Sequence, residues 1–331
     1  MLNNQQADML KTRDLDALKE NESNFILQII AFLISSEFIT LLLVWPTITI
    51  LQLYLPSLLS ETKKELPIFA WLSYELIMRS LSLTGAIVAS LLCINRFTTS
   101  RSTHSLGYLP HKGFLKDYFI GCLISFVMIS IIALIQWLIG GTEFFWAFSK
   151  TNISIIDIVV LFSMLFVAAT YEEVIFRGYP LQTLAHHLSP TLATIIMSGL
   201  FGLVHIGNPS ATFFSTANTV LAGIWLSIAY FKTRSLWLAI GLHLGWNLSM
   251  GAIYGLPVSG ILKLTEYSLL DTHHLGKTWL TGGSYGPEGG AIATLVLILG
   301  TILLIKLPIL KISPEMEKIF TNNQQKNLLK D

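Results

Sequence analysis

Charged side chains are scarce in this sequence. They make up 12% of its 331 residues, whereas 53% are hydrophobic, and a soluble protein of this size typically has about 25% charged residues. This shortage, together with several long apolar runs, excludes an ordinary soluble domain and places the chain among membrane proteins. The formal net charge of only +1 also argues against a polyanion-binding surface, so we expect no nucleic acid among the partners.

The sequence has few cysteines, and no internal repeat stands out in it. The two cysteines, Cys93 and Cys122, lie in apolar stretches without metal-site spacing, which indicates small core residues and no disulfide. Many transporters are built from matching halves, and the lack of a repeat counts against that class.

The polar, mixed-charge start of the chain lacks the features of a cleavable signal peptide. We therefore expect the first spanning helix to serve as an uncleaved anchor.

What the sequence does have is a series of apolar runs of the length that spans a bilayer, about twenty residues each. They predict an all-α fold: a polytopic membrane protein with about eight transmembrane helices enclosing an intramembrane site. The predicted spans lie near 25–45, 67–95, 118–140, 153–171 or beyond, 190–206, 213–231, 235–255 and 290–308. The first span has room to continue past Pro46 to about residue 58.

The spans divide the chain into four regions. A polar N-terminal tail (1–24) precedes the N-terminal transmembrane helices and a basic loop (25–117). The core that carries the candidate site follows (118–308), and a polar C-terminal tail (309–331) ends the chain. Lys and Arg gather in both tails and in the loops after the second, fourth and sixth spans. Because such residues are enriched on the cytoplasmic side, we expect both termini in the cytoplasm.

Three charged residues stand together in the stretch "YEEVIFRGY", at the end of a long apolar run. Charged side chains inside a bilayer are costly and usually mark a functional site. Glu173 and Arg177 are four residues apart, so a helix allows them to form an ion pair. Glu172 is rotated by about 100° from Glu173 on a helix. It can therefore face another target, while the second carboxylate adds a repulsion that structure alone does not require.

Two further apolar segments end in or contain polar residues. "FGLVH" places His205 at the end of the fifth span, and "HLGWN" places His243 and Asn247 inside the seventh. His243 and Asn247 share one helix face because they are four residues apart. Taken singly, each of these residues could be a helix-packing hydrogen-bonding group. Together with the glutamates they form a set of acid–base and hydrogen-bonding groups.

This set allows two kinds of chemistry. Glu172 and His205 could activate a water molecule as a general base, while His243 and Asn247 donate hydrogen bonds to an oxyanion. Alternatively, Glu172, His205 and His243 could be the ligands of a divalent metal such as zinc with one open position. The local pattern of two His four apart around a Glu, typical of zinc proteases, is absent. The sequence leaves the cofactor open between a metal and none.

In these residues the chain resembles the CPBP family of intramembrane endopeptidases, which includes the type II CAAX prenyl endopeptidases and bacterial proteins of bacteriocin processing and self-immunity. The family motifs EExxxR, FxxxH and HxxxN read here "EEVIFR", "FGLVH" and "HLGWN", in the same order and on three apolar segments within 153–255. The segment "GGSYGPEGG" also resembles bacterial members. The resemblance implies a protease core over 118–308.

The resemblance implies a role for each motif residue. Glu172 and His205 would activate the water, His243 and Asn247 would stabilise the oxyanion, and Glu173 and Arg177 would hold the site together. Family members have been described both as metalloproteases and as metal-free, glutamate-dependent enzymes. The implied substrate is a membrane-associated peptide or lipidated protein, in contact with membrane lipids, and the implied location is a bacterial inner membrane. The oligomeric state is left open.

The predicted spans raise one geometrical problem. They place Glu172, His205 and His243 at different depths, so the three side chains would not meet. They would converge if the fourth helix continued through "EEVIFRGY" to about Leu184, with a length of over 45 Å. We therefore predict one long helix there, and a fifth helix that reaches past His205 or sits shallow.

Two other classes of function remain possible from the residues alone. In an ion-coupled carrier, Glu172, His205 and His243 would form a proton relay. In a catalytically silent scaffold, the same cavity would bind a peptide. An enzyme should lose its activity on Glu172→Ala while still folding, a scaffold should keep its effect, and a carrier should show a pH-dependent flux.

Overall fold

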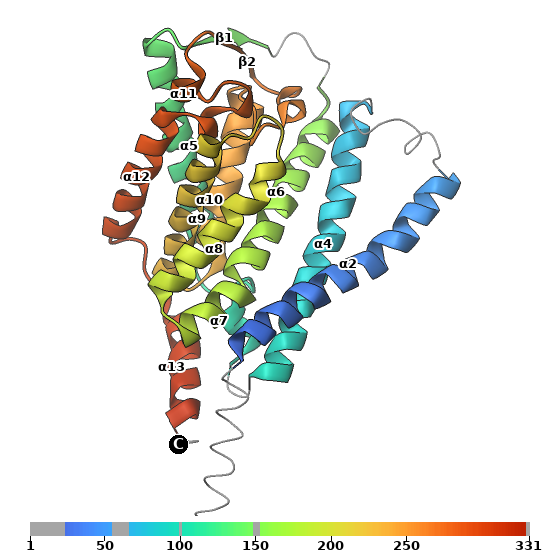
Figure 1. Ribbon diagram of the computed structural model, residues 1–331, viewed down its shortest axis with the longest axis vertical. Coiled ribbons are helices and arrows are strands. Elements are labelled where there is room, and N and C mark those ends of the chain that lie inside the picture. Colours follow the sequence, from blue (N-terminus) through green and yellow to red (C-terminus); the bar gives the residue numbers. More distant parts are fainter. Residues whose placement is uncertain (1–23, 55–65, 99–100, 148–152, 329–331) are drawn as a thin grey trace, which may run out of the picture.

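A computed structural model describes residues 24–54, 66–98, 101–147 and 153–328 as a bundle of long helices (Figure 1). The longer helices are α2 (Phe25–Tyr54), α4 (Ile68–Phe97), α5 (Phe114–Leu138), α6 (Ile155–Arg177), α7 (Tyr179–His187), α8 (Pro190–Val204), α9 (Phe213–Thr233), α10 (Leu236–Leu248), α12 (Ala291–Lys306) and α13 (Pro314–Leu328). The short elements are η1 (Thr103–Leu106), β1 (Thr142–Trp146), η2 (His205–Gly207), the π-helical turn η3 (Ser249–Ile253), η4 (Leu262–Thr265), β2 (Leu270–His274), α11 (Thr278–Thr281), η5 (Gly283–Tyr285) and η6 (Pro287–Gly289).

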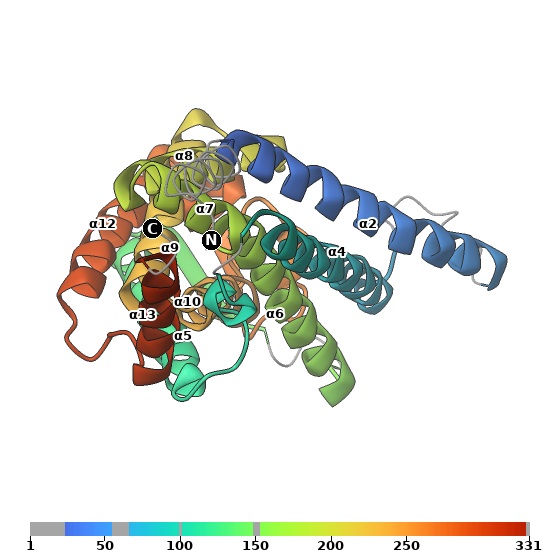
Figure 2. The same cartoon turned by 90° about the horizontal axis from the view of Figure 1, so that it is seen from below.

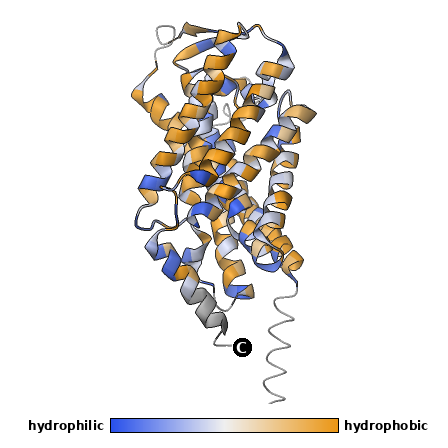
Figure 3. Cartoon of the chain, turned by 90° about the vertical axis from the view of Figure 1, so that its left-hand side faces the viewer, coloured by the Kyte–Doolittle hydropathy of each residue, from blue (hydrophilic) through white to orange (hydrophobic). Residues whose placement is uncertain are grey.

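Seven helical segments of the described chain are long and apolar enough to cross a membrane. They match the first seven predicted spans, with α6 and α7 counted as one segment. Figure 3 shows that hydrophobic residues dominate the helices along their length, and large apolar side chains such as Trp45 and Phe213 are exposed on their surfaces. The protein is therefore an all-α, polytopic integral membrane protein, as predicted.

The eighth predicted span needs a correction. The helix expected over 290–308 exists as α12, but it has only 16 residues, fewer than the roughly twenty that cross a bilayer. Its start is set by the glycine-rich turn that ends at Gly290, and its end lies two residues before Pro308. Proline cannot continue a helix without losing a backbone hydrogen bond, so the apolar run is longer than the helix that it forms.

Several predictions concern the two ends of the chain. Residues 1–23 of the N-terminal tail lie outside the described residues, as does any extension of the first span beyond Tyr54; α2 itself passes through Pro46. The C-terminal tail contains the helix α13. The start of α2 and the helix α13 lie at the same end of the bundle (Figure 1). Which side of the membrane this end faces stays a prediction from the distribution of basic residues.

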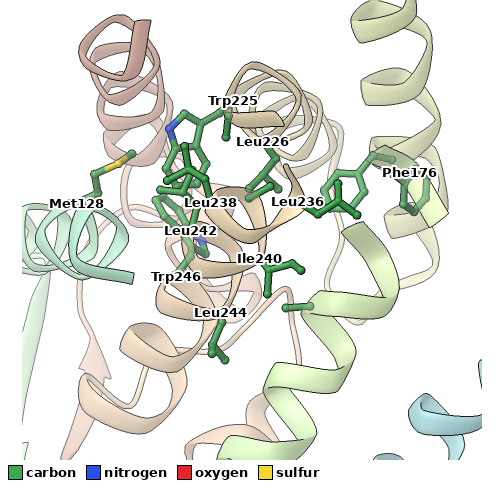
Figure 4. Packing of buried hydrophobic residues seen from close by; sticks show 14 of the residues in the cluster. Met128, Phe176, Trp225, Leu226, Leu236, Leu238, Ile240, Leu242, Leu244 and Trp246 are labelled. Atoms are coloured by element: carbon green, nitrogen blue, oxygen red, sulfur yellow. The ribbon is translucent and has the colours of Figure 1, made fainter. Parts of the chain in front are cut away.

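Helix α10 lies at the centre of the bundle. Its residues from Leu238 to Trp246 are all buried, and Figure 4 shows its side chains surrounded by Met128 of α5, Trp225 of α9 and Phe176 of α6. Helix α10 packs against α5, α6 and α9, so this buried stretch lies in the interior of the bundle. A polar side chain within this stretch, such as that of His243, is therefore held in the interior.

The close packing of α5 against α10 depends on small residues. A Cβ atom added at Gly241 would collide with the backbone carbonyl of Tyr118, and one added at Gly121 would lie 2.6 Å from the carbonyl oxygen of Leu238. Between membrane helices, small residues allow the backbones to approach and so increase van der Waals contact. This contact fixes the position of α10, and with it the polar side chains that α10 carries.

We expect the substitution Gly241→Ala to destabilise the protein by roughly 1–3 kcal/mol, because overpacking forces the two backbones apart. The matched control is Gly199→Ala on α8, where a Cβ would meet no atom within 4 Å. There alanine should be neutral or stabilise by up to about 1 kcal/mol through its helix propensity. Thermal unfolding of the detergent-solubilised variants measures both effects. Equal behaviour of the two variants would show that this contact does not limit stability.

The predicted continuation of the fourth helix through "EEVIFR" is confirmed, but the prediction of one unbroken helix to Leu184 is wrong. Helix α6 ends at Arg177, Gly178 leaves the helical conformation with ψ −123°, and α7 begins at Tyr179. A Cβ at Gly178 would collide with the carbonyl oxygen of Val174, and Pro180 lacks the N–H needed to continue the helix. The break lies after the charged residues, so α6 alone carries all three of them.

The long connection expected at 256–289 is folded onto the end of the bundle. Its strand β2 pairs antiparallel with β1, with Thr142 opposite His274 and Trp146 opposite Leu270. This two-stranded sheet lies at the end of the molecule opposite α13 (Figure 1). The connection therefore covers those ends of α5, α9 and α10 that lie opposite α13. The middle of the bundle is formed by the helices alone.

Candidate active site

Helix α6 places a buried ion pair inside the bundle. Arg177 Nη1 lies 3.1 Å from Glu173 Oε1, and the two side chains are 1% and 0% exposed. Arg177 Nη2 also donates a hydrogen bond to the backbone oxygen of Gly223 on α9, at 3.2 Å. Its guanidinium lies over the ring of Phe201 on α8, 4.4 Å from the ring centre. The predicted ion pair is present, and it connects α6 to both α8 and α9.

Glu173 also holds a histidine of the central helix. His243 Nδ1 lies 2.8 Å from Glu173 Oε1, the same oxygen that accepts the hydrogen bond from Arg177. An ionised carboxylate can only accept hydrogen bonds, so the proton of this contact belongs to His243 Nδ1. A second group that fixes the tautomer and orientation of a histidine is a common feature of sites that use its other nitrogen. The Nε2 atom of His243 therefore faces the site.

His205 is oriented in the same way by its own helix. It follows the last residue of α8 and begins the turn η2, and its Nδ1 lies 2.7 Å from the carbonyl oxygen of Phe201. A carbonyl oxygen is an acceptor, so this contact also places the proton on Nδ1. The predicted helix does not extend past His205 as an α-helix. The 3₁₀ turn instead directs Nε2 of His205 toward α6.

Glu172 brings the three helices together at one point. Its Oε2 atom lies 3.8 Å from His205 Nε2 and 3.8 Å from His243 Nε2. The three side chains are only 21%, 14% and 10% exposed, and among the described residues Oε2 is a buried atom that accepts no hydrogen bond. The distances are too long for direct hydrogen bonds but suit groups that share a small molecule such as water.

Asn247 is less deeply placed than the other candidates. It lies one turn beyond His243 on α10 and is half-buried, and within the described part of the chain its amide makes no hydrogen bond. Its neighbour Trp246 is fixed, because its Nε1 donates to Glu288 Oε1 at 3.0 Å. Glu288 Oε2 in turn accepts hydrogen bonds from the backbone N–H and the hydroxyl of Ser259, at 2.8 and 2.7 Å. The loop 256–289 thus holds the end of α10 in place.

The chemical types of the three converging groups match those of a zinc site, but their spacing does not. Two donors bound to one zinc at about 2.0–2.1 Å in tetrahedral geometry lie roughly 3.4 Å apart, whereas Glu172 Oε2 lies 3.8 Å from each imidazole nitrogen. Throughout the described ranges, no group of three His, Cys, Asp or Glu side chains is arranged to hold a metal ion. The residues at this site therefore supply side-chain groups for acid–base chemistry without a metal-binding arrangement.

Two contributions to the site have no signal in the sequence. The carbonyl oxygen of Gly223 accepts a hydrogen bond from Arg177, and a backbone acceptor on another helix cannot be recognised from residue types. The link from Glu288 to Trp246 joins residues 42 positions apart. Glu288 does stand out in the glycine-rich stretch before α12, but nothing local indicates its partner.

Fold and site together define a class of protein: a polytopic helical membrane protein with a carboxylate–histidine site between its helices. A comparison with protein families makes this class more specific. The family model of the Rce1-like type II CAAX prenyl endopeptidases matches residues 153–249, the part of the chain that runs from the start of α6 to the end of α10. This match confirms the resemblance to the CPBP family. At the level of the family, the match supports a CAAX-type intramembrane protease. No curated protein and no solved structure matches the chain.

Proposed function

We propose that the protein is an intramembrane endopeptidase in which Glu172, assisted by His205, activates a water molecule to hydrolyse a peptide bond. The observation that carries this proposal is the convergence of Glu172 Oε2 with the Nε2 atoms of His205 and His243, contributed by α6, η2 and α10. All three atoms belong to segments that can cross a membrane. The matched family is one of proteases, which favours hydrolysis over proton transport.

The reaction follows from the roles that these atoms allow. Glu172 accepts a proton from the water while the water oxygen attacks the carbonyl carbon of the substrate. His205 accepts a hydrogen bond from the same water at Nε2, because its Nδ1 proton is used by Phe201. The bond between carbonyl carbon and nitrogen then breaks, and the proton held by Glu172 passes to the leaving nitrogen.

The negative charge that develops on the carbonyl oxygen needs hydrogen-bond donors in fixed positions. We assign this role to His243 and Asn247, which lie one turn apart on the buried helix α10. Glu173 lies against Nδ1 of His243 and so stabilises a positively charged ring, whose Nε2–H can donate to the oxyanion. The Asn247 amide makes no hydrogen bond with any described residue and supplies the second donor.

The substrate is a peptide or lipidated protein that reaches the site from the membrane. Glu172, His205 and His243 are mostly buried, and the helices around them expose apolar side chains over their outer faces. A substrate with an apolar anchor can approach through such a surface, whereas a soluble protein cannot bring an extended segment to this depth. We therefore propose membrane-associated or CAAX-type lipidated peptides as the substrate class.

A cleavage assay tests the function. Purified protein in detergent and in liposomes would be given fluorogenic peptides with and without a C-terminal lipid, beside the variants Glu172→Ala and His205→Ala. We expect cleavage by the wild type and none by either variant, with all three samples monodisperse. Cleavage that is unchanged in both variants would contradict the assigned site. If a broad panel gives no cleavage and liposomes show a pH-dependent flux, the protein is a carrier instead.

Removal of metal ions is expected to leave the cleavage rate unchanged. The spacing of Glu172, His205 and His243 differs from that of zinc ligands, and the proposed steps need only their side chains. The measurement compares the rate before and after dialysis against 1,10-phenanthroline, with the zinc content of both samples determined. Loss of activity that returns on addition of zinc would show that these residues act as ligands.

A further inference from the structure

Helices α2 and α4 lie outside the segment that matches the protease family, yet both carry ionisable residues inside spans of the membrane. Glu37 belongs to α2, and Glu75 and Arg79 belong to α4. Seen from the end of the bundle, the two helices lie to one side of it, next to α6 (Figure 2). Charged groups at membrane depth are costly and usually serve a function, and the mechanism above uses none of these three.

Arg79 has unused hydrogen-bonding capacity. Its Nε lies 3.6 Å from Glu75 Oε2, one turn earlier on α4, which is an ion pair but longer than a hydrogen bond. A guanidinium has five N–H donors, and among the described residues none of those on Arg79 meets an acceptor within hydrogen-bond distance. The side chain is 38% exposed, so these donors can be reached from outside the helix pair.

The position of Arg79 on its helix disfavours the nearest alternative partner, a lipid phosphate. It is the twelfth residue of α4, which runs from Ile68 to Phe97, so it lies about 17 Å from the start of the helix and farther from its end. Lipid phosphates lie at the edges of a bilayer whose hydrocarbon core is about 30 Å thick. An acceptor supplied by a peptide can meet Arg79 at this level of the helix without moving the guanidinium toward the membrane surface.

The catalytic carboxylate lies on the neighbouring helix. Helix α4 packs along α6, and Tyr171, the residue before Glu172, interacts electrostatically with Glu37, Arg79 and Glu172. The charged groups of α2 and α4 are therefore within electrostatic reach of the turn of α6 that carries Glu172. A peptide that passes the site in an extended form covers about 3.3 Å per residue, so a few residues beyond the cleaved bond suffice to reach this region.

We propose that Arg79 binds a carboxylate of the peptide substrate and thereby places the cleaved bond beside Glu172. A guanidinium binds a carboxylate through two parallel hydrogen bonds, and Glu75, on the Nε side, leaves the two Nη groups for this contact. The carboxylate is either the C-terminus of the peptide or an Asp or Glu side chain near it. This inference rests on the proposed endopeptidase function and names its substrate class more closely.

Glu37 gives the proposal a second, opposite consequence. It is exposed on α2, within electrostatic reach of Tyr171 like Arg79, and among the described residues it has no ion pair or hydrogen bond. Because it has the same charge as the proposed ligand, it opposes binding of a carboxylate. Removal of its charge should strengthen binding, whereas removal of the Arg79 charge should weaken it.

The test uses three peptides of one sequence: a free C-terminal acid, its amide, and the amide with an Asp near the C-terminus. Each is measured with the wild type, with Glu37→Gln, and with the double variant Glu75→Gln plus Arg79→Gln, which leaves the net charge of the pair unchanged. KM is determined by cleavage. Equilibrium binding is measured by fluorescence anisotropy in a Glu172→Gln background, where it does not depend on turnover.

We expect the wild type to bind the peptide with the recognised carboxylate about tenfold or more tightly than the amide, the range of a charged hydrogen bond. The free acid identifies the C-terminus as the source and the Asp peptide identifies a side chain. The preference should vanish in the double variant and increase in Glu37→Gln.

Equal binding of all peptides by the wild type would overturn the carboxylate site, even if cleavage itself supports the endopeptidase. A carboxylate preference that is lost in Glu37→Gln but kept in the double variant would also overturn the proposal. The peptide carboxylate would then depend on a cation bound at Glu37 and not on Arg79. A carboxylate preference in binding without any cleavage would support the Arg79 site and contradict the proposed enzyme.

Discussion

Replacement of Glu172 by Gln is expected to reduce kcat/KM by about 10²–10⁴-fold, the contribution of a general base. Glutamine has nearly the same size as glutamate, so the packing of α6 against the two histidines should persist. It cannot accept the proton of the attacking water, which in our mechanism passes to Glu172 Oε2. The measurement is cleavage of the best peptide of the panel by monodisperse protein, over a range of substrate concentrations.

The same substitution at another glutamate provides the control. Glu143 lies on strand β1 at the end of the bundle and is exposed, so Glu143→Gln should leave the rate unchanged. Glu172→Asp keeps a carboxylate but moves it away from His205 and His243 by about one methylene length. We expect it to retain part of the activity. A Glu172→Gln variant with the wild-type rate would exclude Glu172 as the base.

The second large effect concerns stability. Arg177→Met is expected to destabilise the protein by about 3–5 kcal/mol, because it leaves the buried charge of Glu173 without its partner. Arg177 and Glu173 are 1% and 0% exposed, so little water can replace the lost contact. Thermal unfolding in detergent measures the loss.

A double variant separates this structural role from the chemistry. Glu173→Leu combined with Arg177→Met replaces the whole ion pair by apolar side chains, a change that is often neutral for stability. Most of the stability should return. Cleavage should not return, because His243 Nδ1 then lacks the carboxylate that orients its ring. An active double variant would show that Glu173 serves stability alone.

The sequence predicts the helices of this protein well, because membrane spans depend on local composition. Seven of the predicted spans are present. Two predicted helices differ from the observed ones in where they end. The span predicted over 290–308 yields a helix of only 16 residues, and the long helix predicted through Leu184 is interrupted at Gly178. In both places a glycine or proline, rather than hydropathy, determines where the helix ends.

The candidate site was predictable only in part. Spacing along one helix indicates the pair of Glu173 with Arg177, since residues four apart are neighbours. The same rule groups His243 with Asn247, but the hydrogen-bond partner of His243 is Glu173, seventy residues away on α6. Contacts between helices depend on packing, which single residues do not reveal. The roles of the six motif residues, the bacterial inner membrane implied by the family resemblance, and the cytoplasmic termini inferred from the distribution of Lys and Arg stay predictions.

The single oxygen of Glu173 that accepts hydrogen bonds from both Arg177 and His243 has a consequence for biosynthesis. Arg177 is on the same helix as Glu173, so the two charges can neutralise each other while α6 enters the bilayer, before α10 has been synthesised. His243 is synthesised later, and its Nδ1–H then donates a second hydrogen bond to the same oxygen of Glu173. Glu173 and Arg177 can therefore enter the bilayer as a neutral pair, and the set of polar groups around Glu172 is completed only when α10 has joined the bundle.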